Sequence, residues 1–242
     1  MTRLKERLII GLDVPSLGEA EQIVRELGDA VDFYKIGLEL FCAAGPAAVR
    51  MVRGYGRRVF LDLKFHDIPN TVAGAVRGAV ATGAGMLNMH AAAGRLAMTE
   101  AVRAARESAD AAGLPRPILL GVTVLTSLGP DDLAGMNVGV PVERQVEVLA
   151  RQAKDAGLHG VVCAGAEARR IKEVCGSDFV TVVPGIRPAW AAANDQKRAM
   201  TPAEALANGA DYLVVVRPVL AAADRRTALA RILAEMEEGK DA

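Results

Sequence analysis

The sequence lacks the features that mark membrane, secreted and nucleic-acid-binding proteins. Acidic and basic residues balance at 29 each, which removes any bulk attraction to nucleic acid or to an anionic membrane. The longest charge-free run, between Arg77 and Arg95, is interrupted by glycines and polar residues, so no spanning helix is expected. Asp13 interrupts the first apolar stretch too early for a signal peptide.

Cysteine and aromatic residues are also scarce. The three cysteines, Cys42, Cys163 and Cys175, have no CxxC spacing, so we interpret them as packing residues of a cytoplasmic protein without disulfides or structural zinc. Aromatic residues make up only 4% of the chain, so Ala, Val, Leu and Ile must build most of the core. Branched aliphatic side chains inside a barrel, covered by alanine-rich helices, fit this composition.

Short apolar runs recur along the chain, and each is followed by a segment with helical period. Most runs are nearly continuous in Val, Ile and Leu, as is typical of parallel strands covered by helices on the outside. The predicted strands are Leu8–Val14, Phe33–Leu38, Arg58–Lys64, Gly85–Ala91, Pro117–Thr126, Gly160–Ala164, Phe179–Ile186 and Asp211–Arg217.

Helix starts are visible between these runs. Ser16 and Glu19 have the spacing of a capping box, and so do Thr201 and Glu204, with Pro202 at the first helical position. Strand and helix alternate eight times without a linker or a change in composition. We therefore predict one domain over residues 1–242, either an open doubly wound sheet or a closed barrel. No strand is followed by a GxGxxG fingerprint, and the length suits a (β/α)8 TIM barrel, which we favour.

Charged residues gather at the predicted C-terminal ends of the first three strands. Asp13 ends the first, Lys35 lies in the second, and Asp62 and Lys64 end the third, with Asp67 just beyond. Residues two apart on a strand point the same way, so Asp62 and Lys64 are expected to face the barrel mouth together. Charges are costly there unless they are paired or functional, and barrel active sites lie at this end.

Two arginines follow the last two strands. Arg187 comes after the seventh strand and Arg217 ends the eighth, where barrel enzymes often bind phosphate. The segment between Arg187 and Arg198 is long and polar enough to form a closing loop. The charges and arginines together predict an enzyme that acts on a phosphorylated small molecule.

The segment from Asp62 to Thr71 reads DLKFHDIPNT and resembles the D-x-K-x-x-D-[IV]-x-x-T signature of the orotidine 5′-phosphate decarboxylase family. The resemblance covers essentially the whole chain. It extends to Leu12-Asp13, Lys35-Ile36-Gly37, Met89-His90-Ala91, Leu125-Thr126-Ser127, Pro184-Gly185-Ile186-Arg187-Pro188 and Asp195-Gln196.

The resemblance implies decarboxylation of orotidine 5′-phosphate to uridine 5′-phosphate without a cofactor or metal, the last step of de novo UMP biosynthesis. Lys64 would protonate C6, Asp62 would face the substrate carboxylate, and Asp67 would help to keep Lys64 charged. The enzyme would be a homodimer in which Asp67 and Thr71 reach into the partner's site. The substrate would be bound through Asp13 and Lys35 at the ribose, Thr126 at the pyrimidine edge, Gln196 between phosphate and base, and Thr71, Arg187, Val216 and Arg217.

One residue departs from the family pattern. The eighth strand usually ends in Gly-Arg-Pro, whereas this chain has Val216, Arg217 and Pro218. The valine side chain is expected to crowd the phosphate site, so Val216→Gly is predicted to lower the Michaelis constant.

Two alternatives remain open at this point. An enzyme resembling 3-hexulose-6-phosphate synthase would share the barrel and the D-x-K-x-x-D array but would use Mg²⁺. A non-catalytic binder of phosphate ligands would share the fold alone.

Overall fold

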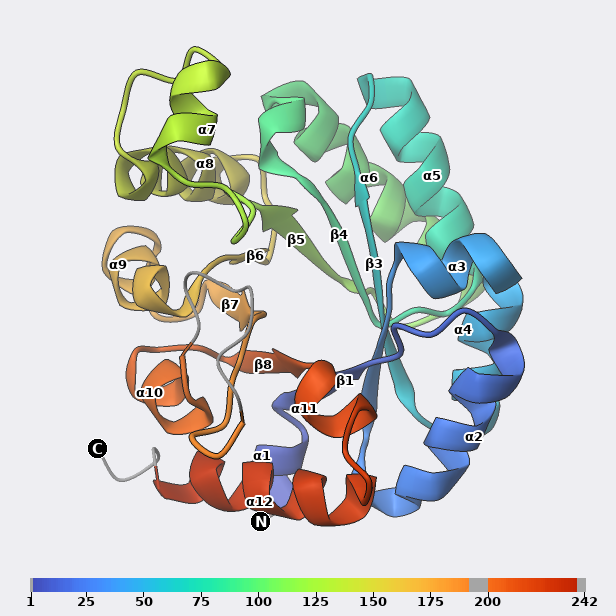
Figure 1. Cartoon of the computed structure of the whole chain (residues 1–242). Helices are drawn as coiled ribbons and strands as arrows, with labels where there is room; N and C mark the ends of the chain where they lie inside the picture. The colour runs from blue at the N-terminus through green and yellow to red at the C-terminus, as the bar shows by residue number, and fades with distance from the viewer. Residues whose placement is uncertain (1, 192–199, 239–242) are drawn as a thin grey trace.

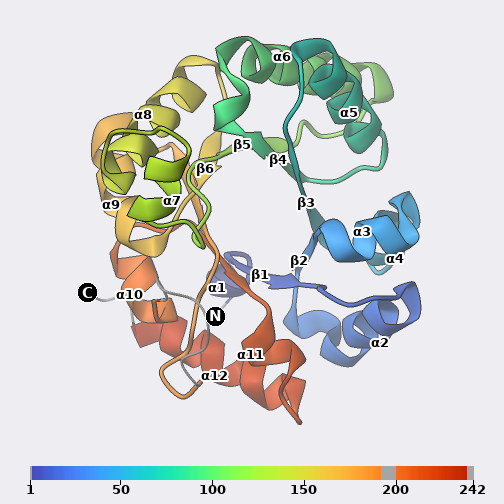
Figure 2. The ribbon, with the colours of Figure 1, turned by 45° about the horizontal axis from the view of Figure 1, so that its top comes forward.

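A computed structural model describes residues 2–191 and 200–238 of the chain, and within them eight parallel strands close into a barrel in chain order. Helices surround the barrel, as Figures 1 and 2 show from two directions. The predicted (β/α)8 TIM barrel is therefore confirmed, and each predicted strand is present. The strands are β1 (Leu8–Gly11), β2 (Phe33–Ile36), β3 (Arg58–Phe65), β4 (Met86–His90), β5 (Ile118–Val122), β6 (Gly160–Val162), β7 (Val180–Val183) and β8 (Tyr212–Val215).

Most strands end earlier than the apolar runs predicted. Apolar residues continue beyond the hydrogen-bonded ladder, because the loops that leave the strands still border the barrel interior. Asp13 and Thr126 consequently lie in loops rather than at strand ends, and Arg217 begins a helical turn instead of ending β8. The predicted strand positions of these three residues were therefore wrong.

The covering helices begin where the capping signals predicted. Thr201 and Glu204 form a complete capping box, with Pro202 in the first turn. At Ser16 only half of the box forms, because Ser16 Oγ accepts the Glu19 N–H while the Glu19 carboxylate contacts the hydroxyl rather than the Ser16 backbone. The α-helices are α1 (Thr2–Lys5), α2 (Leu17–Leu27), α3 (Leu38–Ala44), α4 (Pro46–Gly54), α5 (Pro69–Ala81), α6 (Arg95–Ala112), α7 (Pro130–Gly135), α8 (Val142–Asp155), α9 (Gly165–Cys175), α10 (Pro202–Ala207), α11 (Arg217–Leu220) and α12 (Arg225–Glu238).

One layer of inward-facing apolar side chains fills the middle of the barrel. It consists of Ile9, Phe33, Phe60, Met86, Leu120, Val182 and Val214. Since side chains on a strand alternate between the two faces, the next inward position on each strand lies two residues further on. Those positions include Lys35, Asp62, Asn88 and Val216. The apolar layer therefore forms the base on which a polar layer rests.

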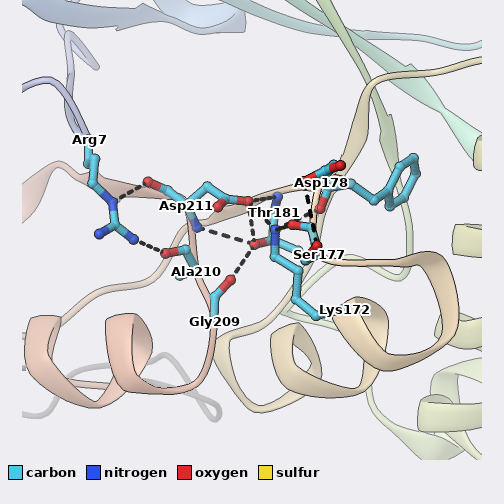
Figure 3. Close-up of polar contacts among 9 residues, drawn as sticks. Arg7, Lys172, Ser177, Asp178, Thr181, Gly209, Ala210 and Asp211 are labelled. Atoms are coloured by element: carbon cyan, nitrogen blue, oxygen red, sulfur yellow. Dashed lines mark hydrogen bonds and ion pairs between the residues drawn. The ribbon is translucent and has the colours of Figure 1, made fainter. Parts of the chain in front are cut away.

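The N-terminal ends of the strands, which we call the closed end, carry a polar cluster of Arg7, Lys172, Thr181 and Asp211 (Figure 3). Lys172 Nζ donates to the carbonyls of Ser177 and Phe179 at 2.8 and 2.9 Å and to Asp211 Oδ2 at 2.6 Å. Arg7 donates to the carbonyls of Ala210 and Asp211. This closed-end cluster ties β1, β7, β8 and α9 together where the barrel closes.

The three cysteines differ in exposure. Cys163 and Cys175 are buried, but Cys42 is exposed, so the interpretation of all three cysteines as packing residues is wrong for Cys42. Cys42 follows apolar residues of α3 in the sequence, but it lies on the exposed side of that helix.

Across residues 2–191 and 200–238, no helix has both the length and the apolar character needed to cross a bilayer.

Candidate active site

The C-terminal ends of the strands, which we call the open end, surround a cavity of about 550 Å³. This volume suits a small-molecule ligand. Every predicted site residue within the described ranges lines this cavity except Asp67 and Thr71. The lining residues that the sequence predicted are Asp13, Lys35, Asp62, Lys64, Thr126, Arg187, Val216 and Arg217.

Asp13, Lys35, Asp62 and Lys64 form a chain of alternating charges, which we call the charged array. Lys35 Nζ lies 2.9 Å from Asp13 Oδ1 and 3.5 Å from Asp62 Oδ2. Lys64 Nζ lies 2.7 Å from Asp62 Oδ1. Asp62 therefore lies between two ammonium groups, and the prediction that Asp62 and Lys64 face the same side is confirmed.

The charged array keeps Asp62 ionised although it is buried. Burial by itself would raise the pKa of this carboxyl, but the charges of Lys35 and Lys64 and hydrogen bonds from Lys64 and Asn88 hold that pKa below its ordinary value of 3.8. Near neutral pH, the site thus presents a fixed carboxylate beside the Lys64 ammonium. Only 30% of the Lys64 side chain is exposed, so this ammonium is partly removed from water.

The backbone of Lys64 has an unusual conformation. Its φ is 52°, in the left-handed region that non-glycine residues enter at a cost of about 1–2 kcal/mol. The register between β3 and β4 also shifts between Leu61 and Phe65. Asn88 on β4 contacts this segment, because Asn88 Oδ1 accepts the Lys64 N–H at 2.8 Å and Asn88 Nδ2 donates to Asp62 Oδ1 at 2.7 Å.

Two histidines lie beside the charged array. The rings of His66 and His90 are 5.2 Å apart between centroids. Burial, with help from His66 and Lys64, lowers the pKa of His90 below its ordinary value of 6.5, so its imidazole is neutral at pH 7. His90 adds no positive charge beside Lys64 under these conditions.

Arg187 and Arg217 lie on the wall opposite Lys64. Arg187 follows β7 and Arg217 begins α11 after β8, whereas Lys64 belongs to β3, on the other side of the closed barrel (Figure 1). Guanidinium groups suit phosphate oxygens. The cavity can therefore hold a ligand with an anionic group at one end and reacting atoms near Lys64 at the other.

The remaining predicted residues lie elsewhere. Asp67 and Thr71 are exposed at the start of α5 and do not line the cavity of their own chain. Asp67 Oδ1 accepts the Ile68 N–H at 2.6 Å. Gln196 falls outside the described residues. In the described part of the chain, no group of three or more His, Cys, Asp or Glu side chains is arranged to hold a metal ion.

Asn88 and the apolar lining of the cavity had been given no site role from the sequence. A polar residue in the centre of an otherwise apolar parallel strand was the available signal for Asn88, because such a position is buried. The apolar lining had no comparable signal, since its residues look like ordinary core. It consists of Phe60, Val122, Val124, Leu125, Val162, Cys163, Pro184, Gly185, Val214, Leu220 and Ala221.

Comparison with known proteins gives consistent matches over the full fold. Residues 6–232 match the sequence profile of the "Orotidine 5'-phosphate decarboxylase / HUMPS family". The orotidine 5′-phosphate decarboxylase of Moorella thermoacetica is 52% identical over 235 residues, which cover 96% of this chain and 93% of that protein. The enzyme of the same name from Syntrophotalea carbinolica is 48% identical over 99% of this chain and 100% of its own length.

Solved structures agree with the sequence matches. The crystal structure of orotidine 5′-phosphate decarboxylase from Lactobacillus acidophilus superposes with a TM-score of 0.84 at 36% identity, covering 95% of this chain and 98% of that chain. An uncharacterized conserved protein from Geobacillus kaustophilus superposes with a TM-score of 0.83 at 38% identity, covering 95% and 99%.

Proposed function

Because this chain belongs to the orotidine 5′-phosphate decarboxylase / HUMPS family, we propose that it decarboxylates orotidine 5′-phosphate to uridine 5′-phosphate and CO2, the last step of de novo UMP biosynthesis. The observation that carries the proposal is the charged array. It brings Lys64 to one wall of a cavity whose opposite wall bears Arg187 and Arg217. The names of the relatives point to the same substrate.

The reaction breaks the bond between C6 and the carboxylate carbon. CO2 leaves, and the bonding electron pair stays on C6 in an sp2 orbital that no π system of the ring can accept. The Lys64 ammonium stabilises this developing charge and then transfers a proton to C6. Water returns a proton to the neutral Lys64 amine and completes the cycle.

No cofactor or metal is needed in this mechanism, because a fixed ammonium supplies both the stabilising charge and the proton. Asp62 keeps Lys64 charged and oriented across their 2.7 Å ion pair. The ionised Asp62 also faces the substrate carboxylate, and their repulsion weakens as CO2 forms.

The remaining contacts hold the substrate across the cavity. Arg187 and Arg217, with the backbone at Val216, bind the phosphate, and Lys35 and Asp13 bind the ribose hydroxyls. Thr126 binds the pyrimidine edge, and Gln196 bridges phosphate and base. Energy from binding the distant phosphate helps to orient the reacting carbon beside Lys64.

The enzyme works as a homodimer in the cytoplasm. Exposed apolar side chains follow three neighbouring strands at the open end: Leu38 after β2, Ile68 after β3 and Leu96 after β4, with exposures of 54%, 67% and 66%. Such a grouping is typical of a protein interface. A second copy seated there brings its Asp67 and Thr71, which lie beside Ile68, toward the cavity of the first.

A direct assay tests the function. Loss of orotidine 5′-phosphate is followed by ultraviolet absorbance and the product is identified by mass spectrometry, with and without EDTA. We expect turnover that EDTA leaves unchanged. Folded protein that fails to act on this substrate, but cleaves hexulose 6-phosphate once Mg²⁺ is added, would favour the sugar-phosphate lyase instead.

A further inference from the structure

The polar side chains above the apolar layer include Lys35, Asp62 and Asn88, and Asn88 is the uncharged one of these three. Its side chain is fully buried, at 0% exposure, and both ends of its amide are used. Oδ1 accepts the backbone N–H of Lys64, and Nδ2 donates to the same Asp62 oxygen that pairs with the Lys64 ammonium. One amide thus contacts both members of the ion pair.

This double contact explains how Lys64 keeps an unfavourable backbone conformation. The left-handed φ of Lys64 and the register shift beside it leave its N–H directed at a side chain instead of a regular ladder partner. Without a buried acceptor, that N–H would be left unsatisfied. Asn88 supplies the acceptor and also fixes one oxygen of Asp62.

We propose that Asn88 is a positioning residue for the decarboxylation, which holds the Lys64 backbone and the Asp62 carboxylate in the arrangement that aims the ammonium at C6. It touches neither the cavity nor the substrate and acts through Lys64 and Asp62. The inference rests on the proposed function, since it assigns a role within that reaction.

Asn88→Leu tests it, because leucine has a similar volume but makes neither hydrogen bond. We expect kcat to fall about 100-fold while the Kd for uridine 5′-phosphate changes less than about threefold, because the phosphate and ribose contacts remain. Asn88→Asp keeps the shape and the acceptor but places a second carboxylate beside Asp62, so a similar loss of kcat is expected if the leucine variant fails to fold.

Thr181→Val is the matched control, since Thr181 is equally buried at the closed end. It is expected to lower stability and leave kcat unchanged. Either Asn88 variant, folded and within about threefold of wild-type kcat, would overturn the positioning role. Absence of turnover in the wild-type protein would instead reject the proposed function, so the two failures are distinguishable.

A second observation concerns the family departure at Val216. Gly11 on β1 lies next to Val216 across the β1–β8 pair, one step beyond the register pair Ile10 and Val215, and it pairs with Lys35 on β2. A Cβ atom on Gly11 would lie 2.6 Å from Val216 Cγ2 and 3.1 Å from Lys35 Cε. The φ of Gly11 is not positive, so its backbone does not require glycine. Space alone requires it.

We infer that Gly11 and Val216 are a complementary pair. Because Gly11 has no side chain, the Val216 side chain fits beside it, and the methylene chain of Lys35 keeps its position. The charged array depends on that stem, because Lys35 reaches both Asp13 and Asp62. This inference also deepens the proposed function. It replaces the expectation, drawn from the sequence alone, that Val216→Gly improves substrate binding.

A double-mutant cycle tests the pair. Gly11→Ala is expected to raise the KM for orotidine 5′-phosphate about tenfold, because the added methyl group crowds Lys35. Val216→Gly is expected to raise it about threefold, because it leaves a gap beside Gly11. The double variant is expected to return to within about threefold of wild type. Gly18→Ala is the control, since no atom lies within 4 Å of the Cβ position there.

The Kd for uridine 5′-phosphate, measured for the same variants by calorimetry, gives a readout that does not need turnover. If the effects of the two single changes on KM and Kd simply add in the double variant, the proposed coupling of Gly11 and Val216 is wrong. A wild-type protein that binds this nucleotide but has no turnover would reject the proposed function while leaving the coupling measurable.

Discussion

The two ends of the barrel each carry lysine–aspartate pairs, but the pairs differ in what surrounds them. At the closed end, Lys172 donates to two backbone carbonyls and to Asp211, so its donors are used within the protein. At the open end, Lys64 makes one ion pair, with Asp62, in the described part of the chain, and it borders the cavity. The same residue types thus stabilise the fold at one end and remain available to a ligand at the other.

The presence of a lysine–aspartate pair in a barrel therefore does not by itself indicate a functional site. The number of lysine donors that the protein leaves unused distinguishes the two cases. A lysine whose donors are all satisfied contributes to stability. A lysine such as Lys64, which lines a cavity, pairs with one carboxylate and has a strained backbone, keeps donors that can bind a ligand. Variants at the two ends should therefore separate activity from stability.

Lys64→Ala should give the largest effect. Loss of the proton donor and of the stabilising charge is expected to lower kcat by about 10⁴-fold or more. Stability should fall far less than activity, because Asp62 keeps its ion pair with Lys35 and its hydrogen bond from Asn88. Steady-state kinetics and urea unfolding measure the two quantities, and a stability loss that accounted for the lost activity would contradict the assignment.

Asp67→Ala tests whether the open end is completed by a second copy. It is expected to lower kcat/KM by about 10²–10³-fold, although Asp67 does not line its own cavity. Mixing Asp67→Ala with Lys64→Ala subunits should restore about a quarter of wild-type activity, because half of the dimers then carry one intact site. No recovery after subunit exchange would place Asp67 in its own chain's site or outside catalysis.

Lys172→Ala sharpens the comparison from the closed end. Removing this lysine takes its donor from the carbonyls of Ser177 and Phe179 and its ion-pair partner from Asp211, which keeps only its hydrogen bonds from Thr181, so we expect a loss of about 2 kcal/mol in the free energy of unfolding. The kcat of the folded variant should match wild type at a temperature where it remains folded. A selective fall in kcat would show that the two ends are not separate in function.

The pH dependence of stability gives a smaller effect. The pKa of Asp62 is lower in the folded protein than its ordinary value of 3.8, so the ionised carboxylate favours folding above that value. This contribution is lost as pH falls through the lowered pKa. The stability difference between wild type and Asp62→Asn should therefore be largest near neutral pH and shrink in acid.

Asp110→Asn is the control for this measurement, because Asp110 pairs with Arg116 on the surface. Its stability difference near neutral pH should be much smaller than that of Asp62→Asn, because this ion pair is exposed to solvent. A difference for Asp62→Asn that did not shrink in acid would mean that the Asp62 charge does not contribute to folding.

Much of the fold could be predicted from the sequence, because apolar runs and helical segments alternate and local capping signals mark helix starts such as Thr201. The ends of the strands could not be predicted. Asp13 and Thr126 follow apolar residues that border the barrel interior but do not take part in the hydrogen bonding between strands. Where a strand ends is decided by the register of its neighbours, which leaves no local pattern.

The charged array could also be predicted, because charged residues at the ends of parallel strands meet at one end of a barrel. The two-residue spacing of Asp62 and Lys64 pointed to the right outcome, although the left-handed backbone of Lys64 interrupts the regular alternation on which that expectation was based. The partners of these residues on other strands could not. Asn88 reaches Lys64 through a shift in the β3–β4 register, and Gly11 accommodates Val216 across the β1–β8 pair. Both relations depend on tertiary distances that no single segment encodes.

The most direct test measures conversion of orotidine 5′-phosphate by wild type, Lys64→Ala and Lys172→Ala side by side, with EDTA present and folding checked by circular dichroism. We predict turnover in wild type and Lys172→Ala and none detectable in Lys64→Ala. Near-normal turnover in folded Lys64→Ala would contradict the central claim that the open-end lysine carries the chemistry.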